Sequence, residues 1–116
     1  MRLAALAVLA ALGVAVPPVA RGAEALSGAQ LFVRPDKGNC IACHQVPEGA
    51  GPKTRSDLGP RLEGVRMRAL GRERLRALLD DPMANNPDTL MPPFGRHKLL
   101  DAAQIDRLID YLDALP

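Results

Sequence analysis

The pentapeptide Cys40-Ile41-Ala42-Cys43-His44 constrains this chain more than any other feature, and it contains both of the cysteines in the sequence. On one helical turn, side chains three positions apart point to the same side, so each sulfur can add to one vinyl group of a haem. The adjacent His44 imidazole is then placed over the iron as its proximal ligand. The pentapeptide therefore predicts one haem c, bound through Cys40 and Cys43 and ligated by His44.

Two other uses of a C-x-x-C pair fit this chain less well. A disulfide or a thioredoxin-like redox pair belongs to a fold with alternating strands and helices, a pattern that the sequence lacks. A zinc site needs four ligands, and only His44 and the distant His97 could join the two cysteines. Covalent haem is the interpretation that we prefer.

The composition also calls for a large apolar cofactor. Hydrophobic residues make up 47% of the chain, but there is one Tyr, two Phe and no Trp. One small domain with so few rings buries little apolar surface by itself, and a haem can complete its core. The net charge of +2 lacks the strongly basic balance expected of a nucleic-acid-binding protein.

The N-terminus reads as a secretory signal peptide over residues 1–25. Arg2 is followed by fourteen uncharged residues, 3–16, a run too short for a membrane helix, and then by Pro17 and Pro18. Cleavage is expected after Ala23-Glu24-Ala25, with Ala20-Arg21-Gly22 as a weaker site and an uncleaved anchor as the alternative. We expect a periplasmic domain over residues 26–116 without a stable membrane span.

The rest of the chain predicts an all-α fold. Helices are expected over residues 28–33, 65–70 and 72–81, and a longer one after the N-cap Asp101. Two loops rich in Pro and Gly, residues 46–59 and 83–98, separate them. Arginines gather on the middle helices and aspartates on the last one, and we interpret both groups as solvated helix faces, with a docking surface as the alternative.

The sixth iron ligand is the main open choice. The candidates are Met67, Met83, Met91 and His97. We favour Met91 because Pro92 and Pro93 fix the backbone that follows it. Met67 suits a core position, nothing fixes the loop around Met83, and His97 or an open site remains an alternative. Iron held by His44 and Met91 has a raised reduction potential, which points to electron transfer.

A haem-ligating histidine usually donates its second ring N–H to a fixed acceptor. The segment Gly59-Pro60-Arg61-Leu62 offers a rigid carbonyl at a suitable distance along the chain. We therefore expect Nδ1 of His44 to donate to the carbonyl oxygen of Pro60, with an ordinary turn as the alternative.

These motifs together resemble class I cytochromes c. The resemblance covers nearly all of residues 26–116 and rests on the first helix, the haem motif, the segment 59–62, the methionine loop and the last helix. It implies the class I cytochrome c fold, with short helices packed around one covalently attached haem. It also implies that Gly28 and Phe32 of the first helix lie against Leu108 and Tyr111 of the last.

A narrower resemblance rests on residues 38–44 and on Asn-Pro-Asp-Thr-Leu-Met-Pro-Pro-Phe at 86–94. These stretches look like the SoxX family, the monohaem subunits of SoxAX cytochromes. The resemblance implies a heterodimer with a SoxA-like cytochrome subunit, acting as an L-cysteine S-thiosulfotransferase that joins thiosulfate to a cysteine of a SoxY-type carrier. This chain would supply no catalytic nucleophile and would pass the released electrons to a soluble cytochrome c.

Two other functions stay open. One is an independent periplasmic monohaem shuttle for an oxidase or a dehydrogenase, which a stable heterodimer would argue against. The other is a haem sensor with an open sixth position, which the absorption spectrum of a Met91→Ala variant would distinguish.

Overall fold

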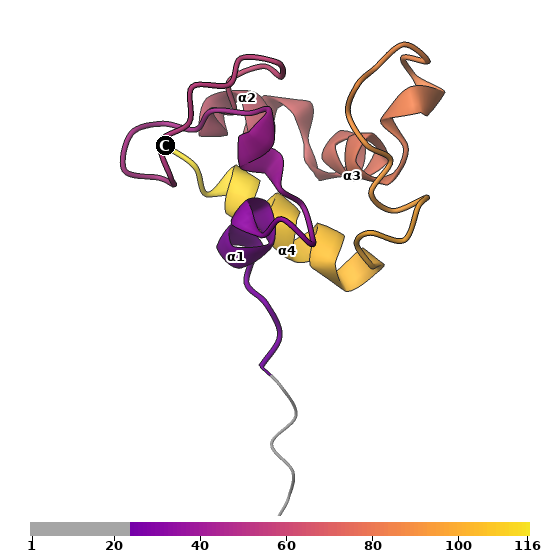
Figure 1. Ribbon diagram of the computed structural model, residues 1–116, viewed down its shortest axis with the longest axis horizontal. Helices are drawn as coiled ribbons and strands as arrows, with labels where there is room; N and C mark the ends of the chain where they lie inside the picture. The colour runs from indigo at the N-terminus through magenta and orange to yellow at the C-terminus, as the bar shows by residue number, and fades with distance from the viewer. Residues whose placement is uncertain (1–23) are drawn as a thin grey trace, which may run out of the picture.

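The computed structural model describes residues 24–116, and these form an all-α domain without strands (Figure 1). The helical elements are α1 Gly28–Val33, η1 Cys40–Ala42, α2 Gly64–Leu70, α3 Arg72–Asp80, η2 Pro82–Ala84 and α4 Ala102–Asp113. The predicted fold class is confirmed, while the two short 3-10 turns η1 and η2 add to the expected elements. The predicted signal peptide lies outside the described residues, apart from its last two positions.

Reciprocal side-chain caps begin two of the helices, α1 and α4. The sequence predicts the reciprocal pair for α4 and only the N-cap residue for α1. The Ser27 hydroxyl accepts from the Gln30 backbone N–H at 3.2 Å, and the Gln30 side chain accepts from the Ser27 N–H at 2.8 Å. Asp101 and Gln104 make the same exchange at 2.7 and 3.0 Å. Each pair satisfies two backbone donors that the first helical turn leaves free.

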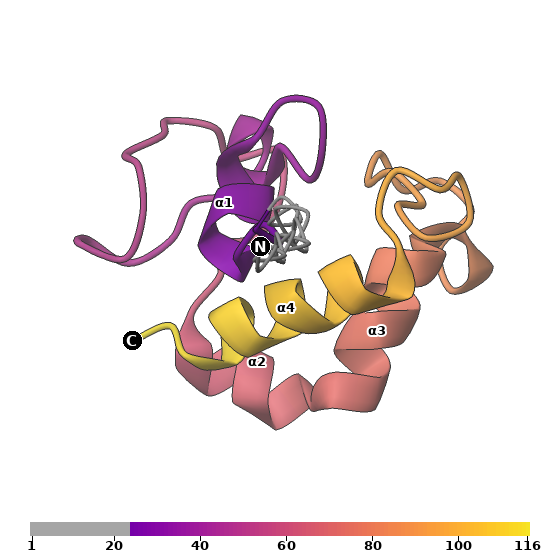
Figure 2. The same cartoon turned by 90° about the horizontal axis from the view of Figure 1, so that it is seen from below.

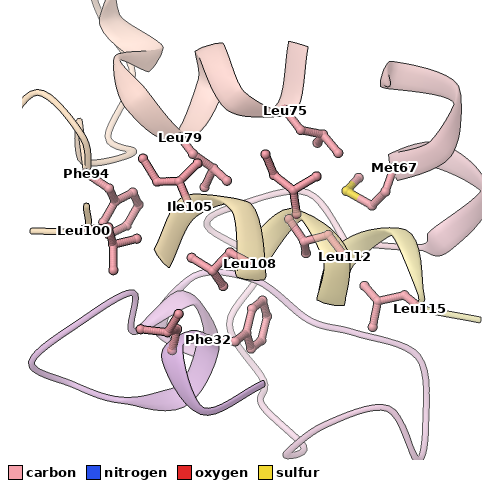
Figure 3. Close-up of a cluster of buried hydrophobic side chains, with 12 residues drawn as sticks. Phe32, Met67, Leu75, Leu79, Phe94, Leu100, Ile105, Leu108, Leu112 and Leu115 are labelled. Carbon is pink, nitrogen blue, oxygen red and sulfur yellow. The ribbon is translucent and has the colours of Figure 1, made fainter. Parts of the chain in front are cut away.

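The hydrophobic core is built around α4, which lies between α1 on one side and α2 and α3 on the other (Figures 2 and 3). Its leucines and isoleucines repeat at helical spacing, and Ile105, Leu108, Ile109 and Leu112 are all buried. The buried hydrophobic side chains are Leu31, Phe32, Met67, Leu75, Leu79, Phe94, Leu100, Ile105, Leu108, Ile109, Leu112 and Leu115. Among residues 24–116, no helix is both long enough and apolar enough to cross a bilayer.

The crossing of α1 and α4 is close, as the resemblance to class I cytochromes c implies. A Cβ atom on Gly28 would lie 2.7 Å from Cβ of Tyr111, so the backbones meet where only glycine fits. Phe32 packs on the same tyrosine ring.

The arginines of α3 and the aspartates of α4 face each other. Arg72 lies 2.7 Å from a carboxylate oxygen of Asp110, and Arg76 pairs with Asp106. All four side chains are partly or largely exposed, so salt screens these pairs and they orient the helices more than they stabilise them. Arg72 and Arg76 on the predicted solvated face of α3 thus pair with aspartates of α4 while remaining partly exposed.

Candidate haem site

The cysteines lie on one compact turn. The backbone N–H groups of Cys43 and His44 both donate to the carbonyl oxygen of Cys40, at 3.1 and 2.8 Å. Asn39 begins η1 with a left-handed backbone, φ 47°, a conformation that asparagine tolerates better than most residues. The turn therefore draws both cysteines and the histidine into one short stretch of backbone, as covalent haem attachment requires.

The glycine before this turn lets the turn pack against α1. A Cβ on Gly38 would lie 2.7 Å from the Leu31 carbonyl oxygen and 3.0 Å from Sγ of Cys40. The Gly38 N–H donates to that same carbonyl at 3.1 Å. A larger residue would push the turn away from the helix, so Gly38 positions the first cysteine.

The His44 ring is held in one orientation by Pro60. Nδ1 of His44 and the carbonyl oxygen of Pro60 are 2.7 Å apart, which is the contact that the sequence predicts. A carbonyl oxygen only accepts, so Nδ1 must carry the proton and donate it. In the neutral ring, Nε2 then has a free lone pair, which is the state that iron ligation requires.

Two backbone hydrogen bonds hold the Pro60 segment beside the haem motif. Gly59 N–H donates to the Cys43 carbonyl, and Leu62 N–H donates to the Gln45 carbonyl, both at 2.8 Å. The Pro60 carbonyl is fixed between them. A Cβ on Gly59 would lie 2.6 Å from Nδ1 of His44, so the absence of a side chain at 59 allows the segment to lie against the imidazole.

Both cysteine sulfurs are available for covalent attachment. Both cysteines are half-buried thiols without a disulfide. Burial, as the largest cause, raises the pKa of the Cys40 thiol to about 12, so its sulfur stays uncharged. Within residues 24–116, no group of three His, Cys, Asp or Glu side chains lies close enough to hold a metal ion. Cys40, Cys43 and His44 are the residues that would hold a haem, with the two thiols as attachment points and the imidazole as one iron ligand.

The structure separates the four candidates for the sixth ligand. Met67 is 5% exposed and packs in the core between α2 and α4, near Leu115 (Figure 3). Met83 is 40% exposed on η2, and His97 is also exposed. Met91 is half-buried and packs against the edge of the core cluster, as Cys40 does. Of the four side chains, Met91 is the one that combines partial burial with a place at the edge of the core.

The loop that carries Met91 and the segment that carries the haem motif lie on one side of the molecule. In Figure 2, residues 34–62, in purple to magenta, and residues 85–98, in orange, lie above α4, while α2 and α3 lie below it. The prolines after Met91 continue into the buried side chain of Phe94, which anchors this end of the loop. Two loops that are distant in the sequence thus share the face opposite α2 and α3.

Two of the residues that shape the site are not evident from the sequence. Gly59 is expected only as the end of the loop 46–59, although its position beside Pro60 and the lack of a side chain are what allow contact with His44. Gly38 entered only as the first residue of the stretch 38–44 that carries the narrower resemblance, and no physical role was expected of it. A glycine next to a haem motif or next to a proline acceptor is the signal that could have indicated both.

Comparison with known proteins gives one family. The model of the family described as cytochrome c oxidase, cbb3-type, subunit III, matches residues 23–112, which is most of the chain. A search of curated proteins found no match. A cytochrome c domain implies covalently bound haem c with its iron, and Cys40 and Cys43 are compatible with that attachment.

Proposed function

Because this chain belongs to the family of cytochrome c domains described as cytochrome c oxidase, cbb3-type, subunit III, and therefore has a haem electron-transfer role, we propose that it carries single electrons through an iron held by His44 and Met91. The observation that carries this proposal is the hydrogen bond of 2.7 Å between His44 Nδ1 and the Pro60 carbonyl oxygen. This hydrogen bond leaves Nε2 with a lone pair that points in a fixed direction. An imidazole prepared in this way is suited to bind iron, and this supports the proposal for His44.

Met91 is the second ligand in this proposal. Its thioether is uncharged and polarizable, and a half-buried position at the edge of the core suits such a side chain. A thioether ligand beside an imidazole ligand would favour the reduced iron and raise the reduction potential. Two protein ligands also leave no position for oxygen or a substrate, so the proposed activity is electron transfer alone.

When bound, the haem supplies one reversible electron per iron. The chain's own residues contribute the remaining properties. Cys40 and Cys43 fix the cofactor, Pro60 fixes the ring of His44, and the core around α4 keeps water from one side of the site. A site that changes little on gaining or losing an electron transfers it quickly because little reorganisation is needed.

Replacing Met91 by Ala tests the ligand assignment. We expect a ferric spectrum of an open or water-bound iron and a lowered midpoint potential, because the soft thioether is gone. Met83→Ala is the matched control, since that methionine is exposed, and it should keep the wild-type spectrum and potential. If both variants keep the wild-type spectrum, the assignment of Met91 is wrong, and a sensor with another sixth ligand or none becomes the better account.

The physiological setting that we propose is a SoxAX-type heterodimer in the periplasm. Support comes from the similarity of residues 38–44 and 86–94 to SoxX subunits. Joining thiosulfate to a thiolate on a SoxY-type carrier forms one S–S bond and releases two electrons. With one haem held by Cys40, Cys43 and His44, this chain would deliver the two electrons in succession to a soluble cytochrome c for each bond formed at the partner subunit.

A second setting is favoured by the family itself. Its name describes a subunit of an oxidase, so an independent shuttle or subunit that delivers electrons to an oxidase is the alternative. Mild purification from the native host, with intact mass spectrometry of all components that elute together, distinguishes the two. A partner in one-to-one ratio with its own covalent haem supports the heterodimer. A lone haem protein, or an oxidase that elutes with the chain, contradicts it.

The same spectra locate the N-terminus of the purified protein. We expect it near Leu26, which would show that the predicted signal peptide is removed after export. A mass that includes residues 1–25 would instead indicate a retained leader.

A further inference from the structure

The backbone of Met91 is held by a side chain two residues before it. The hydroxyl oxygen of Thr89 accepts a hydrogen bond from the Met91 backbone N–H at 3.2 Å, and Thr89 is half-buried. This contact closes a turn of the type that threonine hydroxyls often form with the chain that follows. Between the two residues, Leu90 is 84% exposed and points away from the core.

The turn before Thr89 is closed in a similar way. The Thr89 N–H donates to the Asn86 carbonyl at 3.1 Å, and the Asp88 N–H donates to the Asn86 side-chain oxygen at 3.3 Å. Pro87 at the second position of this turn fixes its φ angle. Two turns closed by side chains therefore lead, one after the other, from η2 to Met91.

Few backbone hydrogen bonds are available to hold the segment 87–93 in place. Pro87, Pro92 and Pro93 have no N–H, so much of the segment 87–93 cannot join a backbone ladder. After Met91, the next backbone donor is the N–H of Phe94, which donates to the Pro92 carbonyl at 3.0 Å. The hydrogen bond from the Met91 N–H to the Thr89 hydroxyl is thus one of the few that hold this segment in place.

We propose that Thr89 is a positioning residue for the sixth ligand, whose hydroxyl holds the Met91 backbone and so keeps the thioether on the iron. The inference rests on the proposed function, because it requires Met91 as the ligand. Pro92 and Pro93 restrain the backbone on one side of Met91, and Thr89 restrains it on the other. Without the hydroxyl, the side chain of Met91 spends more time away from the iron.

Imidazole binding to the ferric holoprotein measures that population directly. Free imidazole reaches the iron only while Met91 is displaced. Its apparent Kd is therefore inversely proportional to the fraction of molecules in which Met91 is displaced. Thr89→Val keeps the shape of the side chain and removes the hydroxyl. We expect an apparent Kd about fivefold lower than wild type, which corresponds to about 1 kcal/mol.

Three further variants make the test specific. Thr89→Ser restores the hydroxyl and should bind imidazole within about twofold of wild type. Leu90→Ala changes an exposed side chain of the same loop and should do the same. Ser27→Ala removes a similar hydroxyl contact, since the Ser27 hydroxyl accepts from the Gln30 N–H at 3.2 Å at the start of α1, and it should leave the imidazole Kd unchanged.

The Met91→Ala background separates this inference from the function on which it rests. Met91→Ala should bind imidazole at least tenfold more tightly than wild type, and adding Thr89→Val should then have no further effect. If Met91→Ala binds as wild type does, the ligand assignment fails. If Met91→Ala binds more tightly but Thr89→Val matches wild type, or Thr89→Ser matches Thr89→Val, the role of Thr89 alone is overturned. Thr89→Ala replaces Thr89→Val in this scheme should the valine variant not accumulate with haem.

Discussion

Phe32 and Tyr111 face each other with ring centroids 5.1 Å apart and ring planes tilted by 53°. Phe32 belongs to α1 and Tyr111 to α4, so the contact joins two helices at opposite ends of the described chain. The Tyr111 hydroxyl also donates to the Ala50 carbonyl at 2.9 Å. One tyrosine therefore connects the helix crossing to the loop that follows the haem motif, in a chain that has only three aromatic residues.

Gly28→Ala should weaken the helix crossing. Its new Cβ would lie 2.7 Å from Cβ of Tyr111 and would also strike the Arg107 backbone, so α1 must move away from α4. We expect the free energy of unfolding to fall by about 1 to 3 kcal/mol in denaturant titration of the holoprotein. Ala29→Ser, at the exposed neighbouring position, should stay within about 0.5 kcal/mol of wild type. Equal losses in the two variants would show that the crossing is not tight at Gly28.

Tyr111→Phe should change how stability depends on pH. Burial raises the pKa of the Tyr111 hydroxyl above its ordinary value of about 10. The unfolded chain then loses this proton at lower pH than the folded protein. The stability contributed by the protonated group is complete below pH 10 or so and is lost as the pH rises through the folded pKa. Denaturant titrations from pH 8 to 11 should therefore show a shallower alkaline decline for Tyr111→Phe than for wild type. Parallel curves would contradict this expectation.

At neutral pH the same variant loses the hydrogen bond to Ala50 while it keeps the ring contact with Phe32. We expect a loss of about 1 kcal/mol, the usual net value of one such bond. A variant as stable as wild type at neutral pH would mean that water replaces the Ala50 contact without cost.

Gly59→Ala should displace the proximal histidine. A methyl group at this position would lie 2.6 Å from Nδ1 of His44, so either the ring turns or the segment 59–62 withdraws, and the Pro60 hydrogen bond is strained. We expect at least about 2 kcal/mol lower stability and a lower fraction of chain with covalent haem, measured by intact mass. Gly49→Ala is the control, because a Cβ there meets nothing within 4 Å and only its positive φ costs about 1 kcal/mol. A normal haem content and stability for Gly59→Ala would remove the proposed role of this contact.

Removing both attachment cysteines should leave a chain that does not fold cooperatively. The described core consists mainly of leucine, isoleucine and two phenylalanine side chains, which is little apolar volume for a domain of this size. The Cys40→Ala, Cys43→Ala double variant, prepared without haem, should show no cooperative thermal transition by circular dichroism. A sharp transition would mean that the helices pack stably without the cofactor.

Local sequence information determined the helices and the cofactor chemistry. Ser27 and Asp101 mark helix starts because capping involves residues only three positions apart, and the haem motif lies within five consecutive residues. The Pro60 acceptor could also be anticipated, because a haem-ligating histidine usually donates its second ring N–H to a fixed acceptor and the Pro60 carbonyl lies on a rigid segment. These features depend on short-range geometry, which the sequence encodes directly.

Tertiary structure decided which residues from distant segments meet. The sequence left Met67, Met83, Met91 and His97 as candidates, and packing assigned Met67 to the core and left Met83 and His97 exposed. Packing also paired arginines of α3 with aspartates of α4. It brought Gly59 against His44. Each of these outcomes depends on the distance between segments that are far apart in the chain. The crossing of α1 with α4 and the burial of the core set those distances, and no local pattern contains them.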